Sequence, residues 1–334
     1  MIPNAYNPTA ETEKDPKART SSSSTPSDFS AIIAAVRKNP ERLAELLLVL
    51  VVFIWGANFI VMKAAFRELP PLAFNAVRMT VAAALMGGIW LGRERQRKMP
   101  RSDWLQLAGV GLLGNTCYQI LFVIGLDLTT SAISSLLIGT IPIWTALLAM
   151  ALGWERISQR TWLGIALAFV GVILVTLGSS QGNSLARDLL LGNLLTLGAA
   201  ICWAGYTVFS KRLLERYSAL RVSAVGLVLG VPGLWPFALP DLLSVDWRAL
   251  SPWVYGSILY TSCFPIALAY LIWSYSIQQL GAARTAVFNN AVPVVTFALA
   301  SLVLHEPITW LQLLGGAIVL GGVWQTQERG ASAR

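Results

Sequence analysis

Aromatic and amide side chains recur at helical spacing inside long apolar stretches of this sequence. Trp55 and Asn58 are three residues apart, and Trp203 and Tyr206 repeat that spacing. Residues at this spacing lie on one face of a helix. Because polar groups in hydrocarbon need partners or a wet cavity, the pattern predicts one of two arrangements. One is a pocket for an amphipathic solute, and the other is hydrogen bonding between helices with aromatic residues at the membrane interface.

Further polar and aromatic residues lie in the same apolar stretches. Asn115, Tyr118 and Gln119 share one helical face. Tyr270 and Trp273 lie together on another predicted helix. The predicted substrate-binding residues are Trp55, Asn58, Arg78, Tyr118, Gln119, Trp203, Tyr206, Tyr270, Trp273, Asn289 and Asn290.

Arg78 is a charged residue well inside an apolar stretch that begins at Pro71. Seven residues of helix place it roughly 10 Å into the bilayer, where a charge costs several kcal/mol unless it is paired or hydrated. Asn75 lies one turn earlier and can share its environment. Since neighbouring predicted helices offer no buried carboxylate, we expect backbone carbonyls or a cavity water as partners. A tie between helices and a site for a substrate carboxylate remain equally open.

Two prolines interrupt predicted helices at matching places. Pro142 and Pro293 remove the hydrogen bonds to the carbonyls of Ile138 and Asn289. We expect kinks whose freed carbonyls face a polar site, acting either as static bends or as hinges. Asn289 and Asn290 precede the second kink, so that helix is the more promising binding segment.

Other ionisable residues lie near the predicted helix ends. Lys63 and Lys211 are expected to extend toward the membrane surface. Glu155 and Glu306 are expected to end helices and fix loops. His305, the single histidine, adjoins Glu306, which favours a loop role over proton relay.

The composition explains where these residues must reside. Hydrophobic residues make up 55% of the 334 residues and charged residues 13%, about half the charged share of a soluble domain. The apolar residues form blocks of roughly 17 to 25, long enough for helices that cross a bilayer. The predicted spans are residues 46–66, 71–91, 104–125, 129–151, 161–178, 189–210, 219–239, 252–275, 282–304 and 308–326. The sequence therefore predicts an all-α membrane protein with ten transmembrane helices and both termini on one side.

The net charge of +8 reflects membrane orientation rather than nucleic-acid binding, because most basic residues border predicted helices. The stretches predicted to be cytoplasmic contain Arg37, Lys38, Arg42, Arg93, Arg95, Arg97, Lys98, Arg101, Arg156, Arg160, Lys211, Arg212, Arg216 and Arg221. The outer loops contain few, among them Arg67, Arg187 and Arg248. By the positive-inside rule, both termini are cytoplasmic and the protein resides in the cell (inner) membrane.

The tails lack the composition of folded domains. Residues 1–40 are mostly polar and predict a disordered cytoplasmic tail without the apolar core of a signal peptide. Residues 29–36 offer an alternative, a short segment on the membrane surface. Residues 328–334 form a second cytoplasmic tail.

The sequence contains an internal repeat. Trp55 with Lys63 and Trp203 with Lys211 are matched pairs at an offset of 148. At an offset of 151, Pro142, Glu155, Gly164 and Gly171 match Pro293, Glu306, Gly315 and Gly322. The glycines are expected to permit close helix packing. Because five spans per unit is an odd number, the repeats at 46–178 and 189–327 must be inverted, as in many secondary transporters.

These features resemble EamA-type carriers of the drug/metabolite transporter superfamily over about residues 46–327. The resemblance rests on Trp55-Gly56-Ala57-Asn58-Phe59 through Lys63, Arg78, Pro142 with Gly153-Trp154-Glu155-Arg156, and the Gly164 to Gly171 spacing. It implies inverted five-helix repeats, a central cavity lined mainly by helices 1, 3, 4, 6, 8 and 9, peripheral helices 5 and 10, and export of amino acids or related metabolites. The second repeat has no counterpart of Arg78, so any role of that residue belongs to one half.

Other function classes fit the sequence less well. A membrane enzyme needs a nucleophile with a base, paired carboxylates or metal ligands, and no phosphate-binding loop for ATP is present. We therefore expect no enzymatic activity, cofactor or metal, and we interpret the cysteines as packing residues: Cys117, Cys202 and Cys263. A multidrug or other organic-solute exporter and a non-transporting sensor remain alternatives. The leading prediction is a secondary transporter in the lipid bilayer that exports small metabolites, with amino acids first, and whose oligomeric state the sequence leaves open.

Overall fold

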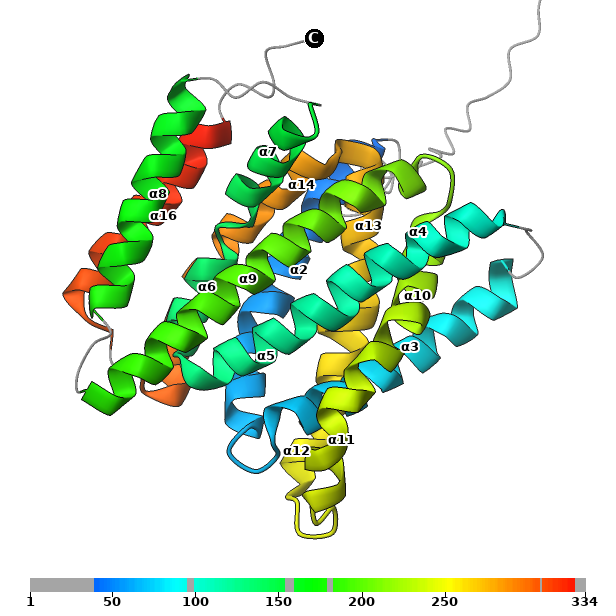
Figure 1. Ribbon diagram of the computed structural model, residues 1–334, viewed down its shortest axis with the longest axis horizontal. Coiled ribbons are helices and arrows are strands. Elements are labelled where there is room, and N and C mark those ends of the chain that lie inside the picture. The colour runs from blue at the N-terminus through cyan, green and yellow to red at the C-terminus, as the bar shows by residue number, and fades with distance from the viewer. Residues whose placement is uncertain (1–38, 95–98, 154–158, 179–182, 307, 328–334) are drawn as a thin grey trace, which may run out of the picture. The chain divides into compact units, whose positions relative to one another are not determined.

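The computed structural model describes residues 39–94, 99–153, 159–178, 183–306 and 308–327. Within these ranges the regular structure is entirely helical (Figure 1), which confirms the predicted all-α class. Eight helical segments are long and apolar enough to cross a membrane: Pro40–Ala65, Pro71–Glu94, Arg101–Leu128, Ser131–Ala151, Arg187–Leu214, Ala219–Ser244, Pro252–Leu280 and Ala282–Leu304. Two shorter apolar helices cover Trp162–Val175 and Trp310–Gln325. Glu155 and the predicted tail segments lie outside the described residues, except Asn39 and Pro40, and the first helix begins at Pro40.

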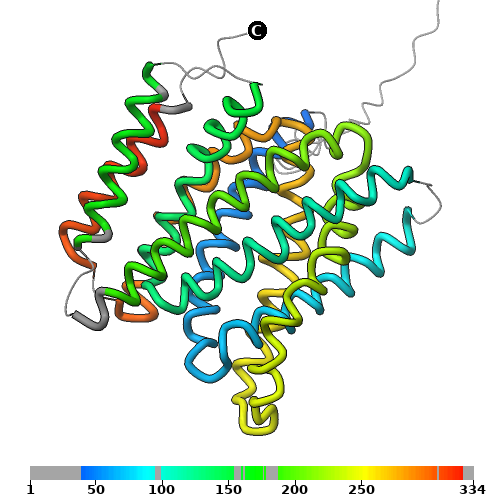
Figure 2. The backbone as a smooth tube through the Cα atoms, in the orientation of Figure 1, coloured from blue at the N-terminus to red at the C-terminus, as the bar shows by residue number. Residues whose placement is uncertain are grey.

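The path of the chain can be followed in Figure 2. In the first half the elements are α2 (Pro40–Ala65), α3 (Pro71–Glu94), α4 (Arg101–Leu112), η1 (Leu113–Cys117), α5 (Tyr118–Leu128), α6 (Ser131–Ile138), α7 (Ile141–Ala151) and α8 (Gln159–Gly178). In the second half they are α9 (Asn183–Leu214), α10 (Ala219–Gly230), η2 (Val231–Leu234), α11 (Trp235–Ser244), α12 (Pro252–Thr261), η3 (Ser262–Leu268), α13 (Ala269–Leu280), α14 (Ala282–Ala286), η4 (Val287–Ala291), α15 (Val292–Leu299), η5 (Ala300–Leu304) and α16 (Trp310–Gln327). Pro71 and Pro252 open their helices, where the missing N–H costs nothing.

Two spans contain a π-helical stretch at matching positions. η1 joins α4 to α5, and η3 joins α12 to α13. The offset of 151 places η1 within η3. Pro265 lies inside η3, where its missing N–H disturbs the regular helical ladder. Such stretches often occur at functional sites, because they redirect the side chains around them.

The prolines break helices rather than bend continuous ones, which corrects the expectation of kinks. Pro142 lies in the first turn of α7, and α6 has already ended at Ile138. Pro293 likewise lies in the first turn of α15, after the 3-10 stretch η4. The reason is that a proline, disfavoured inside a helix, fits readily into the first turn of a new one.

The glycines matched between the repeats bring α8 and α16 into close contact, as predicted. A methyl group added at Gly171 would lie 2.6 Å from the carbonyl oxygen of Gly315. One added at Gly322 would lie 2.5 Å from the carbonyl oxygen of Gly164. The contacts run in opposite directions along the two helices, so the pair is antiparallel. Figures 1 and 2 show the pair side by side at one edge of the bundle.

The main hydrophobic core lies between the two halves of the chain. α2 packs against α13 and α15, and α9 packs against α5 and α7. These are equivalent sets of elements under the sequence repeat. The largest buried cluster accordingly contains Phe59 and Phe122 from the first half and Trp203 and Trp273 from the second.

One end of the bundle gathers basic residues, and we call it the basic end. Arg216 Nη1 donates to the two Asp103 carboxylate oxygens at 2.9 and 3.0 Å, and the Tyr217 hydroxyl donates to the same carboxylate. Arg221 forms an ion pair with Glu94 at 3.4 Å. These contacts bring the ends of α3 and α9 together with the starts of α4 and α10.

At the opposite end Lys63 binds backbone carbonyls, and we call it the Lys63 end. Its Nζ donates to the carbonyl oxygens of Leu126, Asp127 and Thr129 at 2.9, 2.6 and 2.8 Å. These groups belong to the C-terminus of α5, where unpaired carbonyls attract a cation. Lys63 thus binds a helix end in addition to lying near the end of its own helix as expected, and Lys211 is exposed.

Glu306 also lies at the Lys63 end and caps a helix of the other repeat. Its oxygens accept hydrogen bonds from the backbone N–H groups of Ser131 at 3.0 Å and Ala132 at 3.3 Å. A carboxylate at the first turn of α6 satisfies groups that the helix leaves unpaired. Glu306 thus connects the two repeats, in addition to following the end of its own helix as predicted.

Candidate functional site

A small cavity lies between the two halves, next to the broken helices and the π-helical stretches. Its lining residues are Trp55, Asn58, Phe59, Arg78, Tyr118, Gln119, Phe122, Ile138, Ile141, Trp203, Pro265, Ile266, Tyr270, Asn289 and Val292. The cavity volume is about 30 Å³. A water molecule needs a cavity of roughly 10 to 15 Å³, so this cavity has room for only a few water molecules.

Arg78 reaches the cavity from α3 and is held by side-chain amides. The residue is 1% exposed. Its Nε donates to Asn75 Oδ1 at 2.9 Å, and its Nη2 donates to Gln119 Oε1 at 2.9 Å. Gln119 Nε2 in turn donates to the Tyr270 hydroxyl at 2.8 Å. Side-chain amides thus take the place of the backbone carbonyls that we expected, and Asn75 lies beside Arg78 as predicted.

The charge of Arg78 is not neutralised by the walls of the cavity. Among the described residues, no aspartate or glutamate lines it. The guanidinium lies 5.8 Å from the centre of the Phe74 ring, a contact that offsets only part of the cost of burial. The network orients the guanidinium and leaves its charge available to an anionic group.

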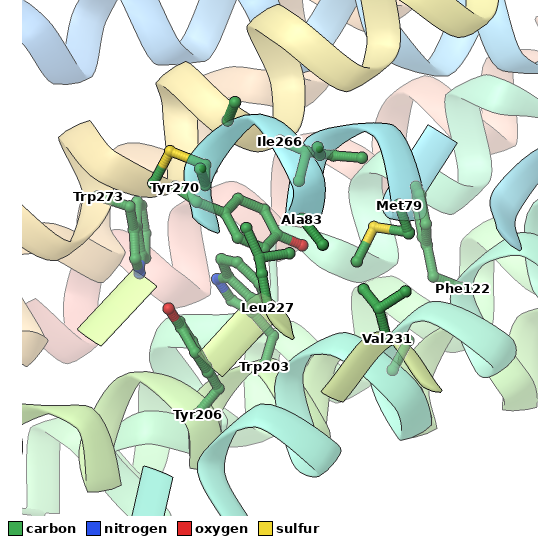
Figure 3. Packing of buried hydrophobic residues seen from close by; sticks show 14 of the residues in the cluster. Met79, Ala83, Phe122, Trp203, Tyr206, Leu227, Val231, Ile266, Tyr270 and Trp273 are labelled. Carbon is green, nitrogen blue, oxygen red and sulfur yellow. The ribbon is translucent and has the colours of Figure 1, made fainter. Parts of the chain in front are cut away.

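Aromatic rings pack around Trp203 on one side of the cavity. The rings of Trp203 and Trp55 meet edge to face at 5.7 Å. Tyr206 stacks on Trp203 at 4.9 Å, and Tyr270 lies 4.9 Å away on another side. Figure 3 shows Trp203, Tyr206, Tyr270 and Trp273 gathered at one end of the buried cluster. Such pairs add about 0.5 to 1.5 kcal/mol each beyond their buried area.

Two predicted site residues lie behind the lining. Tyr206 and Trp273 are each 1% exposed and contact Trp203, but neither lines the cavity. Trp273 Nε1 donates to Thr207 Oγ1 at 3.3 Å. They support the rings that face the cavity. Asn290 and the prolines at 142 and 293 also lie outside the lining.

Both broken helices present their breaks to the cavity. Ile138 and Ile141 flank the break in the first half, and Asn289 and Val292 flank the matching break in the second. The helices that start there, α7 and α15, carry partial positive charge at their N-termini. With Arg78, these N-termini give the cavity an anion-attracting character.

Several lining residues were not anticipated from the sequence. Phe59 and Phe122 meet edge to face at 5.4 Å and lie in ordinary apolar stretches. Ile266 follows Pro265 in η3. Only Pro265 carried a signal, because a proline inside a long apolar block marks an irregular helix.

Comparisons with known proteins agree with this architecture. The model of the EamA-like transporter family matches residues 42–177 and again residues 190–326. An uncharacterized transporter of Archaeoglobus fulgidus is 30% identical over 280 residues, covering 84% of this chain and 96% of its own. A probable amino-acid metabolite efflux pump of Salmonella typhimurium is 27% identical over 291 residues, covering 83% of this chain and 92% of its own.

A solved crystal structure shares the fold. It covers 85% of this chain and 96% of its own, with a TM-score of 0.63 at 20% identity. The family model matches the chain twice, over most of its described helices. This chain is therefore a membrane transporter that belongs to the EamA-like transporter family.

Proposed function

We propose that this protein is a secondary transporter that exports small carboxylate-bearing metabolites, with amino acids as the leading class. Arg78 carries the proposal, because it is buried at the cavity and no described carboxylate of the lining neutralises it. A substrate carboxylate supplies the missing charge, and the N-termini of α7 and α15 favour the same anion. The amphipathic lining, with Trp55 and Trp203, suits the apolar part of such a solute.

The proposed architecture is ten membrane spans in two inverted repeats, covering 46–178 and 189–327. Its support is the antiparallel pairing of the matched helices α8 and α16 through Gly171 and Gly315. The equivalent packing of α2 and α9 against the opposite half supports the same relation. In an inverted-repeat carrier, exchanging the two packings opens a central site alternately to each side. The small cavity then represents a closed arrangement.

The proposed orientation has both termini in the cytoplasm of a cell with the protein in its inner membrane. The basic end contains Arg216, Arg221 and Glu94. Arg93 at the end of α3 and Arg101 at the start of α4 lie there as well. A concentration of basic residues at one end favours that end as cytoplasmic.

The names of relatives support amino acids as the substrate class. Proteins of Salmonella typhimurium and Escherichia coli, each 27% identical to this chain, are named probable amino-acid metabolite efflux pumps. Their likeness extends over 83% of this chain. An organic-cation exporter needs a membrane-embedded acid to attract the cation, which the described cavity lining does not contain.

Counterflow in proteoliposomes tests the proposal. Vesicles loaded with each unlabelled amino acid are diluted into a trace of the same labelled compound, with tetraphenylphosphonium as a cationic comparison and empty vesicles as a control. We expect transient accumulation of at least one amino acid and none of the cation. Accumulation of the cation alone, or of no compound, contradicts the proposal.

A further inference from the structure

Two amide side chains at the cavity have hydrogen-bonding capacity that the described residues do not use. Asn289 is 1% exposed, and neither its Oδ1 nor its Nδ2 has a partner among the described residues. Asn58 is 6% exposed, and its Nδ2 donates to Met62 Sδ at 3.2 Å. Its Oδ1 has no partner in the described part of the chain. Buried amides are normally satisfied, so these atoms indicate a ligand.

The two amides differ in origin from the network around Arg78. Asn58 belongs to α2 and Asn289 to η4, beside the second helix break. Arg78 and Gln119 come from α3 and α5. One group of elements therefore brings the positive charge of Arg78 to the cavity. Another group brings amide oxygens that have no partner among the described residues.

Resting on the proposed function, we propose that Asn58 and Asn289 bind the α-ammonium group of an amino acid whose carboxylate is held by Arg78. Amide oxygens accept hydrogen bonds from an ammonium group. A carboxylate in their place would pair with Arg78 and compete with the substrate for it. The neutral amides thus allow one small cavity to recognise both charges of a zwitterion. They are the residues that distinguish amino acids from plain carboxylic acids.

Matched ligands with and without the amino group test this assignment. The probes are the amino acid that binds the purified full-length protein most tightly among the twenty, and its deaminated carboxylate; L-leucine and 4-methylpentanoate are one such pair. Binding is measured by calorimetry. Asn289→Ala should weaken binding of the amino acid about tenfold, the effect of losing a hydrogen bond to a charged group. Binding of the deaminated acid should change less than about twofold.

Asn289→Asp provides the conservative comparison, since it keeps an acceptor oxygen and adds a negative charge. Because the added carboxylate competes for Arg78, this variant should weaken binding of both ligands, and of the deaminated acid more strongly, since only the amino acid gains an ion pair between its ammonium group and the new carboxylate. Gln278→Ala is the control, because this exposed amide donates to the Leu214 carbonyl, at 2.9 Å, and does not line the cavity. Equal losses for both ligands in Asn289→Ala and Asn58→Ala would overturn this assignment and leave the proposed function in place. Failure of the folded wild type to bind any amino acid would overturn the proposed function with it.

A separate observation concerns the two matched tryptophans. Trp55 Nε1 donates to the carbonyl oxygen of Pro265 in η3 at 2.9 Å. The residue matched to Pro265 in the first repeat, at the offset of 151, is Gly114 in η1. Trp203 Nε1, matched to Trp55 Nε1, is buried without a partner among the described residues. One tryptophan thus makes the bond that its counterpart leaves unmade.

From this difference we infer two exchangeable arrangements of the halves. In the arrangement described here Trp55 binds the Pro265 carbonyl, and in the opposite one Trp203 binds the Gly114 carbonyl while Trp55 releases its partner. Inverted repeats exchange their packings in this way. Because each arrangement keeps one indole bond, this bond by itself does not favour either arrangement.

Phenylalanine variants test the exchange, because they keep an aromatic ring and remove the indole N–H. Spin labels at Arg67 and Leu302, both exposed, report distances at the Lys63 end by pulsed electron resonance without substrate. Trp55→Phe should shift the population toward the opposite arrangement about fivefold, and Trp203→Phe should shift it equally the other way. Shifts in the same direction, or none in either variant, would overturn the inference.

A measurement on the unaltered protein avoids dependence on the variants. Nuclear magnetic resonance of the indole N–H groups reports their hydrogen exchange separately. The Trp55 indole proton should exchange more slowly than that of Trp203, because only the former is bonded in this arrangement. Faster exchange at Trp55 would overturn the inference even if a variant failed to fold.

Discussion

Gln119 and Tyr270 occupy matched positions, 151 residues apart, and Gln119 Nε2 donates to the Tyr270 hydroxyl at 2.8 Å. Trp55 and Trp203, also matched between the repeats, meet edge to face at 5.7 Å. Each repeat therefore contributes the same position to a contact with its counterpart. The cavity lies where these contacts occur, between the two halves.

Removal of Gln119 should destabilise the protein more than removal of the Tyr270 hydroxyl. Gln119→Leu takes a hydrogen bond from the buried charge of Arg78, which costs about 1.5 to 3 kcal/mol. Tyr270→Phe removes a bond between neutral groups, at a cost of about 0.5 to 1.5 kcal/mol. Thermal unfolding in detergent compares the two variants. A larger loss in Tyr270→Phe would show that Gln119 does not stabilise the guanidinium.

Alanine at Gly171 should separate α8 from α16. The added methyl group would lie 2.6 Å from the Gly315 carbonyl oxygen, and overpacking of this kind costs about 1 to 3 kcal/mol. Gly109→Ala is the matched control, because its methyl group meets no atom within 4 Å and should stabilise the helix by roughly 0.4 to 1 kcal/mol. Unfolding temperatures that move in the same direction would contradict this packing.

Glu306 should act as a helix cap rather than a proton carrier. Glu306→Gln keeps an acceptor for the Ser131 and Ala132 N–H groups and should retain most of the transport flux. Glu306→Leu removes the cap and should lower stability by about 1 kcal/mol. Flux in proteoliposomes and unfolding temperature are measured for both. Complete loss of flux in a well-folded Glu306→Gln protein would instead indicate that the carboxylate is required for coupling.

Labelling from outside the cell tests the orientation. In a protein with Cys117, Cys202 and Cys263 replaced, a single cysteine is placed at Arg93 or Arg248, both exposed. An impermeant maleimide should label the variant at 248 and spare the variant at 93, because basic residues concentrate around the latter. Equal labelling in intact cells would refute the proposed topology.

The helical pattern predicted the cavity better than it predicted its contacts. The three-residue spacing of Trp55 and Asn58, repeated at Trp203 and Tyr206, identified helices that meet at the cavity. Periodicity gives the face of a helix, so Tyr206 could not be assigned to a position behind Trp203 without the packing of a third helix.

Hydrogen-bond partners that are distant in sequence could not be predicted, because periodicity does not show which helices pack together. Arg78 and Gln119 are 41 residues apart and lie on different helices, and Lys63 binds carbonyls of a helix end 63 residues away. The prolines indicated irregular helices. The sequence alone did not distinguish a kink from a break or a π-helical stretch. Those outcomes depend on which neighbours satisfy the freed backbone groups.

We propose above all that Arg78 holds the carboxylate of the substrate in the cavity between the halves. Calorimetry tests this claim. It measures the affinity of the wild type, Arg78→Gln and Arg78→Lys for the amino acid that binds the wild type most tightly. All three proteins are first shown by thermal unfolding to be folded. We expect Arg78→Gln to lose roughly 100-fold in affinity, about the value of a charge-assisted hydrogen bond, and Arg78→Lys to lose less. Wild-type affinity in a folded Arg78→Gln protein would contradict the claim.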